Sequence, residues 1–220
     1  MILANLGRRP KSSVVLAAPI IKTPRGQQVL EIAFGRPADA DRLRGWRVAK
    51  NHPLSHAMQD ALEFGRLAGK RWRYYLKRNE AALTLDALAA GIAREPQAEI
   101  GFLLVARATW QPAPKMIGIA WCRRMWCNHI VLDFLAAHPA TFGKDYAGIG
   151  TALLSSIAQV AGRIGAPLVW GEATVLSAAF YRRVLTNEDI LDHFFIPEPT
   201  LAKMRDRLTL QSERKTTPKP

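Results

Sequence analysis

The spacing of apolar and polar residues along the first half of the chain predicts one strand followed by a helical segment. Residues 28–34 alternate with the period of a strand, and Pro37 opens a helix whose first turn carries acidic side chains, which the helix dipole favours. From residue 41 to residue 94, apolar side chains recur at helical spacing, which predicts two or three helices. These apolar positions are Leu43, Trp46, Val48, Met58, Leu62, Phe64, Leu67, Ala82, Leu83, Leu85 and Leu88.

The second half of the chain has the pattern of a sheet with helices between its strands. Two apolar runs, residues 99–109 and 115–124, are joined across Gln111-Pro-Ala-Pro, whose prolines end both strands. Further strands are predicted over residues 129–137, 168–174 and 193–196, and further helices over residues 149–164, 177–185 and 200–208. The alternation of strands and helices predicts an α/β fold.

Composition agrees with one folded domain and excludes a membrane-spanning segment. With 220 residues, 49% of them hydrophobic, the chain can bury a full core. The longest apolar run, residues 14–21, is too short to cross a bilayer and contains Pro19. Residues 1–13 lack the apolar core and cleavage pattern of a secretory signal. Cys122 and Cys127 have the spacing of neither a zinc site nor a disulfide framework. We therefore expect a cytoplasmic protein with no metal site and no membrane contact.

The net charge of +13 is concentrated at the two ends of the chain. Residues 1–25 contain five basic and no acidic side chains, and residues 204–220 contain five basic and two acidic ones. We expect a basic N-terminal arm over residues 1–26 and a folded domain over residues 27–208, with a helical insertion at about 41–94. Residues 209–220 are expected to be a disordered tail. A leader of the transit-peptide kind is the alternative for the arm.

A second basic stretch lies inside the helical segment, interleaved with Trp72, Tyr74 and Tyr75. Such a pattern can bind RNA, because cations hold phosphates and aromatic rings stack on bases. It is equally the pattern of a solvated helix face whose aromatic side chains point into the core, and we favour that interpretation. The basic residues are Arg66, Lys70, Arg71, Arg73, Lys77 and Arg78.

A glycine pair marks the most informative local motif. Gly148-Ile-Gly150 opens the helix that follows the 129–137 strand. Backbone N–H groups at a helix start have no intrahelical partner, and with the positive end of the dipole they favour an anion. Next come the strand over residues 168–174 and a helix that carries Phe180-Tyr181.

This order of strand, Gly148-x-Gly150 helix, strand and Phe180-Tyr181 helix resembles the GNAT superfamily of acyl-CoA N-acyltransferases, over roughly residues 28–197. The resemblance implies a mixed, mostly antiparallel central sheet flanked by helices, here with extra N-terminal helices. It also implies acetyl-CoA as the acyl donor. The family's motif begins with Arg or Gln, whereas this chain has Asp145-Tyr-Ala-Gly148-Ile-Gly150, so Lys144 is expected to supply the compensating charge.

The resemblance also implies a set of cofactor-binding residues in three segments of the chain. Thr174 stands where many members of the family have an Asn that contacts the pantetheine arm, and backbone N–H groups near Leu135 or Ala136 are expected to polarise the thioester carbonyl. The full set is Leu135, Ala136, Ala137, Lys144, Asp145, Tyr146, Ala147, Gly148, Ile149, Gly150, Thr151, Thr174 and Ser177.

Tyr181 matches the family's usual acid and is expected to protonate the departing thiol. The alternative for Tyr181 is a core aromatic paired with Phe180. For the base that takes a proton from the amine, Asp133 and Glu172 are the first candidates, with His129 and His138 behind them. A solvated acid is the alternative for Asp133, and a core or surface residue is the alternative for either histidine.

The resemblance implies an N-acetyltransferase that acts on a primary amine of a small molecule or a protein. The alternative is a regulatory module on the same scaffold that binds acyl-CoA or nucleic acid. A toxin-like aminoacyl-tRNA acetyltransferase would combine the two functions. The sequence leaves a homodimer as one possibility.

Overall fold

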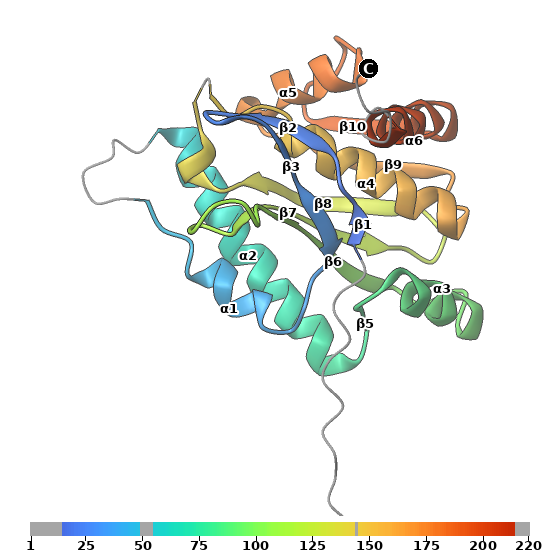
Figure 1. Cartoon of the computed structure of the whole chain (residues 1–220). Helices are drawn as coiled ribbons and strands as arrows, with labels where there is room; N and C mark the ends of the chain where they lie inside the picture. Colours follow the sequence, from blue (N-terminus) through green and yellow to red (C-terminus); the bar gives the residue numbers. More distant parts are fainter. Residues whose placement is uncertain (1–14, 49–54, 144, 214–220) are drawn as a thin grey trace, which may run out of the picture.

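The computed structural model describes residues 15–48, 55–143 and 145–213, with side chains as far as residue 207 (Figure 1). The strands are β1 (Val15–Ala17), β2 (Ile20–Thr23), β3 (Gly26–Val29), β4 (Glu31–Phe34), β5 (Ala81–Ala82), β6 (Ile100–Arg107), β7 (Met116–Arg124), β8 (Ile130–Ala137), β9 (Leu168–Glu172) and β10 (His193–Pro197). The helices are α1 (Asp39–Arg44), α2 (His56–Arg78), α3 (Leu85–Arg94), α4 (Ile149–Ile164), α5 (Val175–Leu185) and α6 (Glu198–Glu213), with a short 3-10 turn, η1 (Pro139–Thr141).

The main sheet has the order β1-β4-β6-β7-β8-β9-β10, and β5 pairs with the start of β6. Five of its neighbouring pairs along this order are antiparallel, and β8 and β9 run parallel. A parallel pair requires a crossover connection, and here α4 provides it. The expectation of an α/β fold with a mixed, mostly antiparallel sheet is confirmed, and this arrangement is consistent with a GNAT fold.

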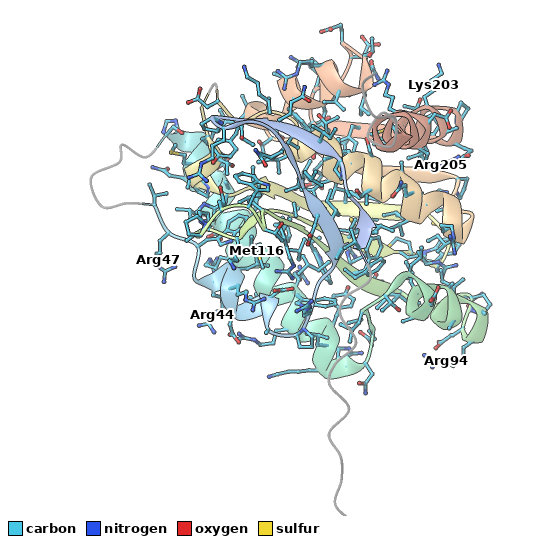
Figure 2. The ribbon with its side chains drawn as sticks, viewed as in Figure 1. Arg44, Arg47, Arg94, Met116, Lys203 and Arg205 are labelled. Atoms are coloured by element: carbon cyan, nitrogen blue, oxygen red, sulfur yellow. The ribbon has the colours of Figure 1, made fainter. Side chains whose placement is uncertain are left out.

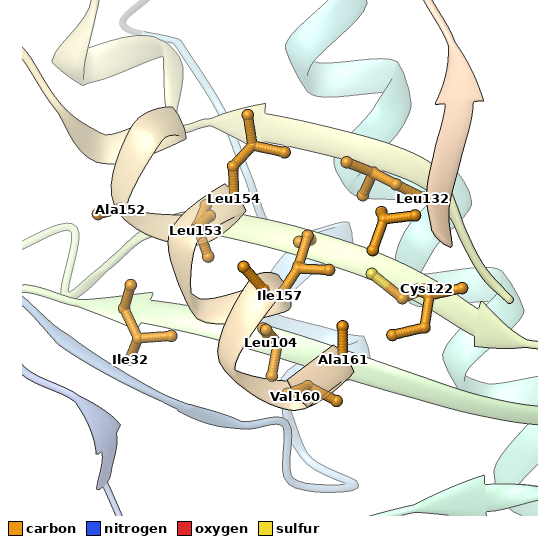
Figure 3. Packing of buried hydrophobic residues seen from close by; sticks show 14 of the residues in the cluster. Ile32, Leu104, Cys122, Leu132, Ala152, Leu153, Leu154, Ile157, Val160 and Ala161 are labelled. Atoms are coloured by element: carbon orange, nitrogen blue, oxygen red, sulfur yellow. The ribbon is translucent and has the colours of Figure 1, made fainter. Parts of the chain in front are cut away.

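Helices cover both faces of the sheet and create two hydrophobic clusters. On one face, α1 and α2 bury Trp72 and Leu43 against Trp121 and its neighbours on β6 and β7. On the other face α4 lies across the strands (Figure 1), and its Leu153 and Ile157 pack on Leu104 of β6 and Leu132 of β8 (Figure 3). The apolar residues of α4 recur at helical spacing, so one side of the helix meets the sheet along its length.

Three of the predicted boundaries are corrected by the structure. Residues 28–34 do not form one strand: β3 ends at Val29 and β4 begins at Glu31, and the N–H group of Leu30 between them donates to Pro19 O at 2.8 Å. Strands β1 and β2 lie within the predicted arm of residues 1–26, so the folded domain includes residues 15–26. Helix α6 reaches Glu213, which makes residues 209–213 helical and not part of a disordered tail.

For the 41–94 segment, where two or three helices were expected, the structure has three, α1, α2 and α3, and α1 begins at Asp39. Residues 1–14 and 214–220, the outer parts of the predicted arm and tail, lie outside the described residues. Among the helices of the described chain, none is long and apolar enough to cross a bilayer.

Candidate active site

Strands β8 and β9 pair along only part of their length, and the gap that follows is the centre of the candidate site. Their parallel pairing runs from Ile130 to Leu132 on β8 and ends opposite Gly171 on β9. A β-carbon at Gly171 would lie 2.5 Å from Leu132 O, so glycine permits this close approach. Beyond Leu132, β8 continues to Ala137 beside β7, whereas β9 ends at Glu172. Residues 133–137 therefore have no β9 partner on that edge.

A β-bulge sits at the point where the two strands part. Leu132 pairs with Cys122 and Phe134 pairs with Trp121, which leaves Asp133 as the extra residue on β8. A bulge changes the direction of the following backbone groups and increases the local twist. The end of β8 consequently turns away from β9. This end contains Leu135 and Ala136, whose backbone N–H groups were expected from the sequence to face the thioester.

A cavity of about 250 Å³ lies in this gap. Leu135, Ala136 and Ala137 of β8 form one wall, Gly150 belongs to the first turn of α4, and Thr174, Ser177 and Tyr181 come from the start of α5. Seven residues predicted from the sequence thus line one cavity. The N-terminal part of α2 closes the cavity with Ala57, Asp60, Ala61 and Phe64, and further apolar side chains are Phe142, Leu176 and Phe180.

The first turn of α4 has the geometry that an anion-binding helix start requires. Gly148 is the N-cap, with a φ of 104°, a conformation that strains any other L-residue. Glycine has no side chain to cap the helix start, and the Gly148 carbonyl accepts from the Ala152 N–H at 2.8 Å. Gly150 serves a second purpose, because a β-carbon there would lie 2.8 Å from the tip of the Phe180 ring. The glycine pair therefore both shapes the loop and lets α5 approach α4.

The loop before α4 is attached to the β2–β3 hairpin. Ala147 and Lys22 exchange two backbone hydrogen bonds, of 3.0 and 3.1 Å. The Tyr146 hydroxyl lies 3.3 Å from Gln111 Oε1, while Asp145 is exposed. Lys144, the predicted source of compensating charge, lies outside the described residues. Lys22 is a cation that sequence reasoning missed, since only the folded chain brings residue 22 next to residue 147.

A smaller hollow of about 100 Å³ lies beside the start of α4. Gly148 and Thr151 line it together with Ile20 of β2 and Arg207 of α6. Ile149, the remaining residue of the predicted loop, points into the core and is buried. The hollow beside the glycine loop thus contains one cation, Arg207 of α6, while exposed Lys22 of β2 is held next to the loop by its backbone bonds to Ala147.

Thr174 and Ser177 cap helix α5. The Thr174 hydroxyl accepts from the Ser177 N–H at 3.2 Å, and the Ser177 hydroxyl accepts from the Thr174 N–H at 2.8 Å, which is a reciprocal capping box. Both side chains also line the cavity. Their predicted contact with the pantetheine arm is compatible with this position, but the cap already occupies part of their hydrogen-bonding capacity.

Tyr181 is 4% exposed and lies between two aromatic rings. Its ring stacks on Phe194 at 4.0 Å and meets the edge of Phe180 at 5.1 Å. Burial, and to a lesser degree the neighbouring Cys122, raises the pKa of the Tyr181 phenol well above its usual value. The hydroxyl therefore stays protonated at neutral pH and can act as a hydrogen-bond donor in the cavity.

The residues predicted as bases do not line this cavity. Asp133 is held in a two-point ion pair by Arg123, with distances of 2.7 and 2.8 Å, and this pair raises the pKa of the Arg123 guanidinium. Glu172 is exposed at the end of β9, opposite His193. His129 precedes the far end of β8, and His138 lines a different hollow. The structure therefore does not bring any of the four to the cavity wall.

Asp60 is the acidic side chain that the described cavity lining does contain. Ala57, Asp60, Ala61 and Phe64 recur at helical spacing on α2, so one stripe of the helix faces the gap. No motif marks Asp60 in the sequence. The sequence feature that could have identified Asp60 is its position on the apolar stripe of a helix, where a single acidic side chain is unusual.

No protein-family model and no curated protein matches the chain. Among solved structures, the chain is similar to nourseothricin acetyltransferase, with 18% identity and a TM-score of 0.36. The match covers 45% of this chain and 66% of nourseothricin acetyltransferase, just under two thirds of that protein's length. It is also similar to a GNAT-family acetyltransferase from Staphylococcus aureus Mu50, with 13% identity, a TM-score of 0.45, and coverage of 77% and 99%.

A third similar structure is yncA from Salmonella typhimurium, solved with its cofactor acetyl-CoA. Its identity is 14% and its TM-score 0.45, and the match covers 77% of this chain and 94% of that one. The resemblance inferred from the sequence thus has counterparts among solved GNAT-family structures at low identity. With TM-scores below 0.5, the likeness is limited to the general arrangement of the fold.

Proposed function

We propose that the protein is an acetyl-CoA-dependent N-acetyltransferase that acetylates a primary amine. The observation that carries this proposal is the cavity between β8 and β9, where the end of β8, the first turn of α4 and the side chain of Tyr181 meet. A helix start, an unpaired strand edge and a protonated phenol are the groups needed to hold a phosphate, polarise a carbonyl and stabilise a leaving thiolate.

The residues around the gap fit acetyl-CoA. The free N–H groups of the α4 first turn, flanked by Lys22 and Arg207, suit the pyrophosphate. Lys22 offsets the exposed Asp145, which replaces the basic or amide residue of the family's motif. The apolar wall formed by Leu135, Ala137 and Leu176 suits the pantetheine arm. Acetyl-CoA supplies an acetyl group already activated as a thioester.

Three groups of this chain then share the work of acyl transfer. Backbone N–H groups on the free edge of β8, near Leu135 and Ala136, orient and polarise the thioester carbonyl. The Asp60 carboxylate holds the incoming ammonium group and accepts its proton, directly or through water. The amine nitrogen forms its bond to the carbonyl carbon, the carbon–sulfur bond breaks, and the electron pair leaves on sulfur.

Tyr181 acts on that departing sulfur. Because burial makes its phenol a weaker acid than a thiol, hydrogen-bond donation to the developing thiolate is its main contribution. The released thiolate then takes its proton from water. The acceptor side of the cavity combines one carboxylate, Asp60, with the rings of Phe64 and Phe142, which favours an amine carried on an apolar body.

Asp60→Asn should lower turnover about tenfold near neutral pH and affect acetyl-CoA affinity little, since the side chain acts on the amine. The loss is limited to about tenfold because the open cavity admits water as a substitute base. It should shrink as the pH rises, because more of the amine then arrives without its proton. The measurement is the release of free thiol from acetyl-CoA across a panel of primary amines and a pH series.

Glu172→Gln is the matched control, since this exposed acid lies outside the cavity lining and its variant should keep parental turnover. If Glu172→Gln loses activity while Asp60→Asn does not, the base has been wrongly assigned to α2 and lies at the end of β9 instead. A protein that binds acetyl-CoA but releases no thiol with any amine would be a ligand-binding module, and the enzymatic proposal would then fail.

A further inference from the structure

Two hollows lined by basic side chains border helix α1, outside the acyl-transfer cavity. The first, which we name the Arg107 hollow, has a volume of about 490 Å³ and is lined by Arg36, Arg42, Arg107, Lys115 and His138, together with apolar residues. The second, the Tyr74 hollow, has a volume of about 510 Å³ and is lined by Arg44, Arg66, Lys70, Arg73, Tyr74 and Lys77. Neither is used by the proposed acetyl transfer.

The carboxylate nearest the Arg107 hollow is already saturated. Asp39 is fully buried and accepts from the Arg36 N–H at 2.8 Å, from Arg42 at 2.8 Å and from Arg107 at 2.6 Å. It neutralises only one of the cations around the hollow and fixes two of the guanidinium groups in place. The Nε–H of Arg107 is buried and has no hydrogen-bond partner within the described structure. A buried donor without a partner is costly, so an acceptor from outside would satisfy it.

His138 adds another donor to the same hollow. Its Nδ1 accepts from the Ala140 N–H at 3.1 Å, so the imidazole proton resides on Nε2. Burial lowers the pKa of His138 to about 4, which keeps the ring neutral at physiological pH. With Asp39 saturated, the ionisable side chains that line the Arg107 hollow are all hydrogen-bond donors. Such a lining is complementary to an oxyanion.

The Tyr74 hollow has excess cations along one stripe of α2. Arg66 pairs with Glu63, with one distance of 2.8 Å, and Arg73 pairs with Asp41. In contrast, Lys70, Lys77 and Arg44 make no ion pair with any described residue. Arg66, Lys70, Arg73 and Lys77 recur every three or four residues, which places them in one row along the helix. The row faces Arg44 of α1 across the hollow.

Tyr74 is the aromatic side chain of this stretch that is available to a partner. Trp72 and Tyr75 are buried in the core, as the second interpretation of the basic stretch predicted, whereas Tyr74 is 50% exposed. The Arg78 guanidinium lies 5.4 Å from the centre of the Tyr74 ring and also pairs with Glu80. Arg71 is exposed but does not line the hollow. An exposed ring among cations is the arrangement on which a nucleobase can stack.

Both hollows border the last turn of α1. Arg42 and Gly45 line one of them and Arg44 lines the other, so along the helix axis they are about 5 Å apart or less. Figure 2 shows Arg44 and Arg47 at this edge of the molecule, and Arg94, Lys203 and Arg205 at the opposite edge. A single phosphate would occupy one hollow, whereas a chain of phosphates can occupy both.

We propose that the Arg107 and Tyr74 hollows together bind the phosphodiester backbone of a single-stranded RNA, with Tyr74 stacking on a base. The contact does not depend on acetyl transfer, because the hollows share no lining residue with the acyl-transfer cavity. Binding is expected to be salt-sensitive, since each phosphate neutralised by a lysine or arginine releases a counterion.

A triple variant with Lys70→Glu, Lys77→Glu and Lys115→Glu should bind a fluorescent single-stranded RNA oligonucleotide at least about tenfold more weakly at moderate salt. The salt dependence of RNA binding should also become less steep in this variant. Lys70 and Lys77 make no ion pair with a described residue, and Lys115 lies on the rim of the Arg107 hollow, so the fold should survive. Acetyl-CoA affinity, measured on the same variant, should stay at the parental value.

The matched control reverses three exposed charges elsewhere, with Arg94→Glu, Arg163→Glu and Lys203→Glu on α3, α4 and α6. Both triple variants change the net charge equally, so equal losses of RNA binding would show a general charge effect and overturn the proposal. No RNA binding by the parent at low salt would overturn it too. Pyrophosphate binding that the lysine variant loses, together with no RNA binding by the parent, would assign the hollows to a small oxyanion instead.

Discussion

Tyr181→Phe should lower kcat about a hundredfold near neutral pH and leave acetyl-CoA affinity almost unchanged. The hydroxyl acts on charge that develops on sulfur only in the transition state, so its loss affects turnover and not ground-state binding. A hundredfold corresponds to about 2.7 kcal/mol, the size of one well-placed hydrogen bond to a developing anion. Because burial keeps the phenol protonated well above neutral pH and its role is hydrogen-bond donation, the loss should persist as the pH rises.

The fold should tolerate this substitution, because phenylalanine keeps the ring that stacks on Phe194 at 4.0 Å. Tyr74→Phe is the control, since it removes a hydroxyl from an exposed tyrosine away from the cavity. Steady-state turnover with a reactive amine, combined with calorimetry of acetyl-CoA, separates kcat from affinity. Parental turnover over the whole pH range would reduce Tyr181 to a packed aromatic, which is the alternative that the sequence left open.

Gly150→Val should abolish detectable acetyl-CoA binding, which means a loss of about a hundredfold or more. A β-carbon at this position would lie 2.8 Å from the Phe180 ring and would cover backbone at the start of α4. The ring must shift within the cavity wall, and the branched side chain reduces the space beside the helix N–H groups. Calorimetric titration of acetyl-CoA measures the effect.

Gly162→Val supplies the comparison on the same helix. A β-carbon at Gly162 would approach the Arg205 side chain at 3.0 Å, and this flexible side chain can move away. The control should bind acetyl-CoA like the parent. Thermal unfolding of both variants shows whether the fold survives. A folded Gly150→Val variant with parental affinity would remove the glycine pair from the cofactor site.

The parts of the site that are continuous in sequence were predictable from sequence. The 129–137 strand, the glycine loop, the next strand and the Tyr181 helix follow one another closely, and their hydrophobic periods are distinct. Because α4 connects the parallel neighbours β8 and β9, segments that follow one another in the sequence also lie side by side in the fold. Seven of the predicted site residues consequently line one cavity.

The proposed proton acceptor, Asp60, was not predictable in the same way. Asp60 reaches the cavity only because α2 packs across the sheet, and its place on the apolar stripe of a helix does not indicate which part of the sheet that stripe covers. Asp133 was the natural candidate, but the bulge and the Arg123 ion pair commit it to a structural contact. Side-chain direction at a bulge cannot be derived from strand alternation.

The N-terminal segment was misjudged for a related reason. Residues 1–25 contain five basic and no acidic side chains, and this charge favoured an arm. The order of residues 15–23 comes from partners distant in sequence: β1 pairs with β4, and Lys22 bonds to Ala147. A local sequence pattern does not predict pairing between residues that are distant in sequence. This pairing nevertheless places Lys22 beside the glycine loop.

Amide hydrogen exchange with and without saturating acetyl-CoA tests the location of the cofactor site most directly. We expect slower exchange at residues 133–137 and in the first turns of α4 and α5, because these backbone groups lie at the cavity or at the glycine loop. Helix α3 should exchange unchanged. Saturating binding that protects other segments and leaves these three unaffected, or no binding at millimolar acetyl-CoA, would contradict the assignment of the gap between β8 and β9 as the acetyl-CoA site.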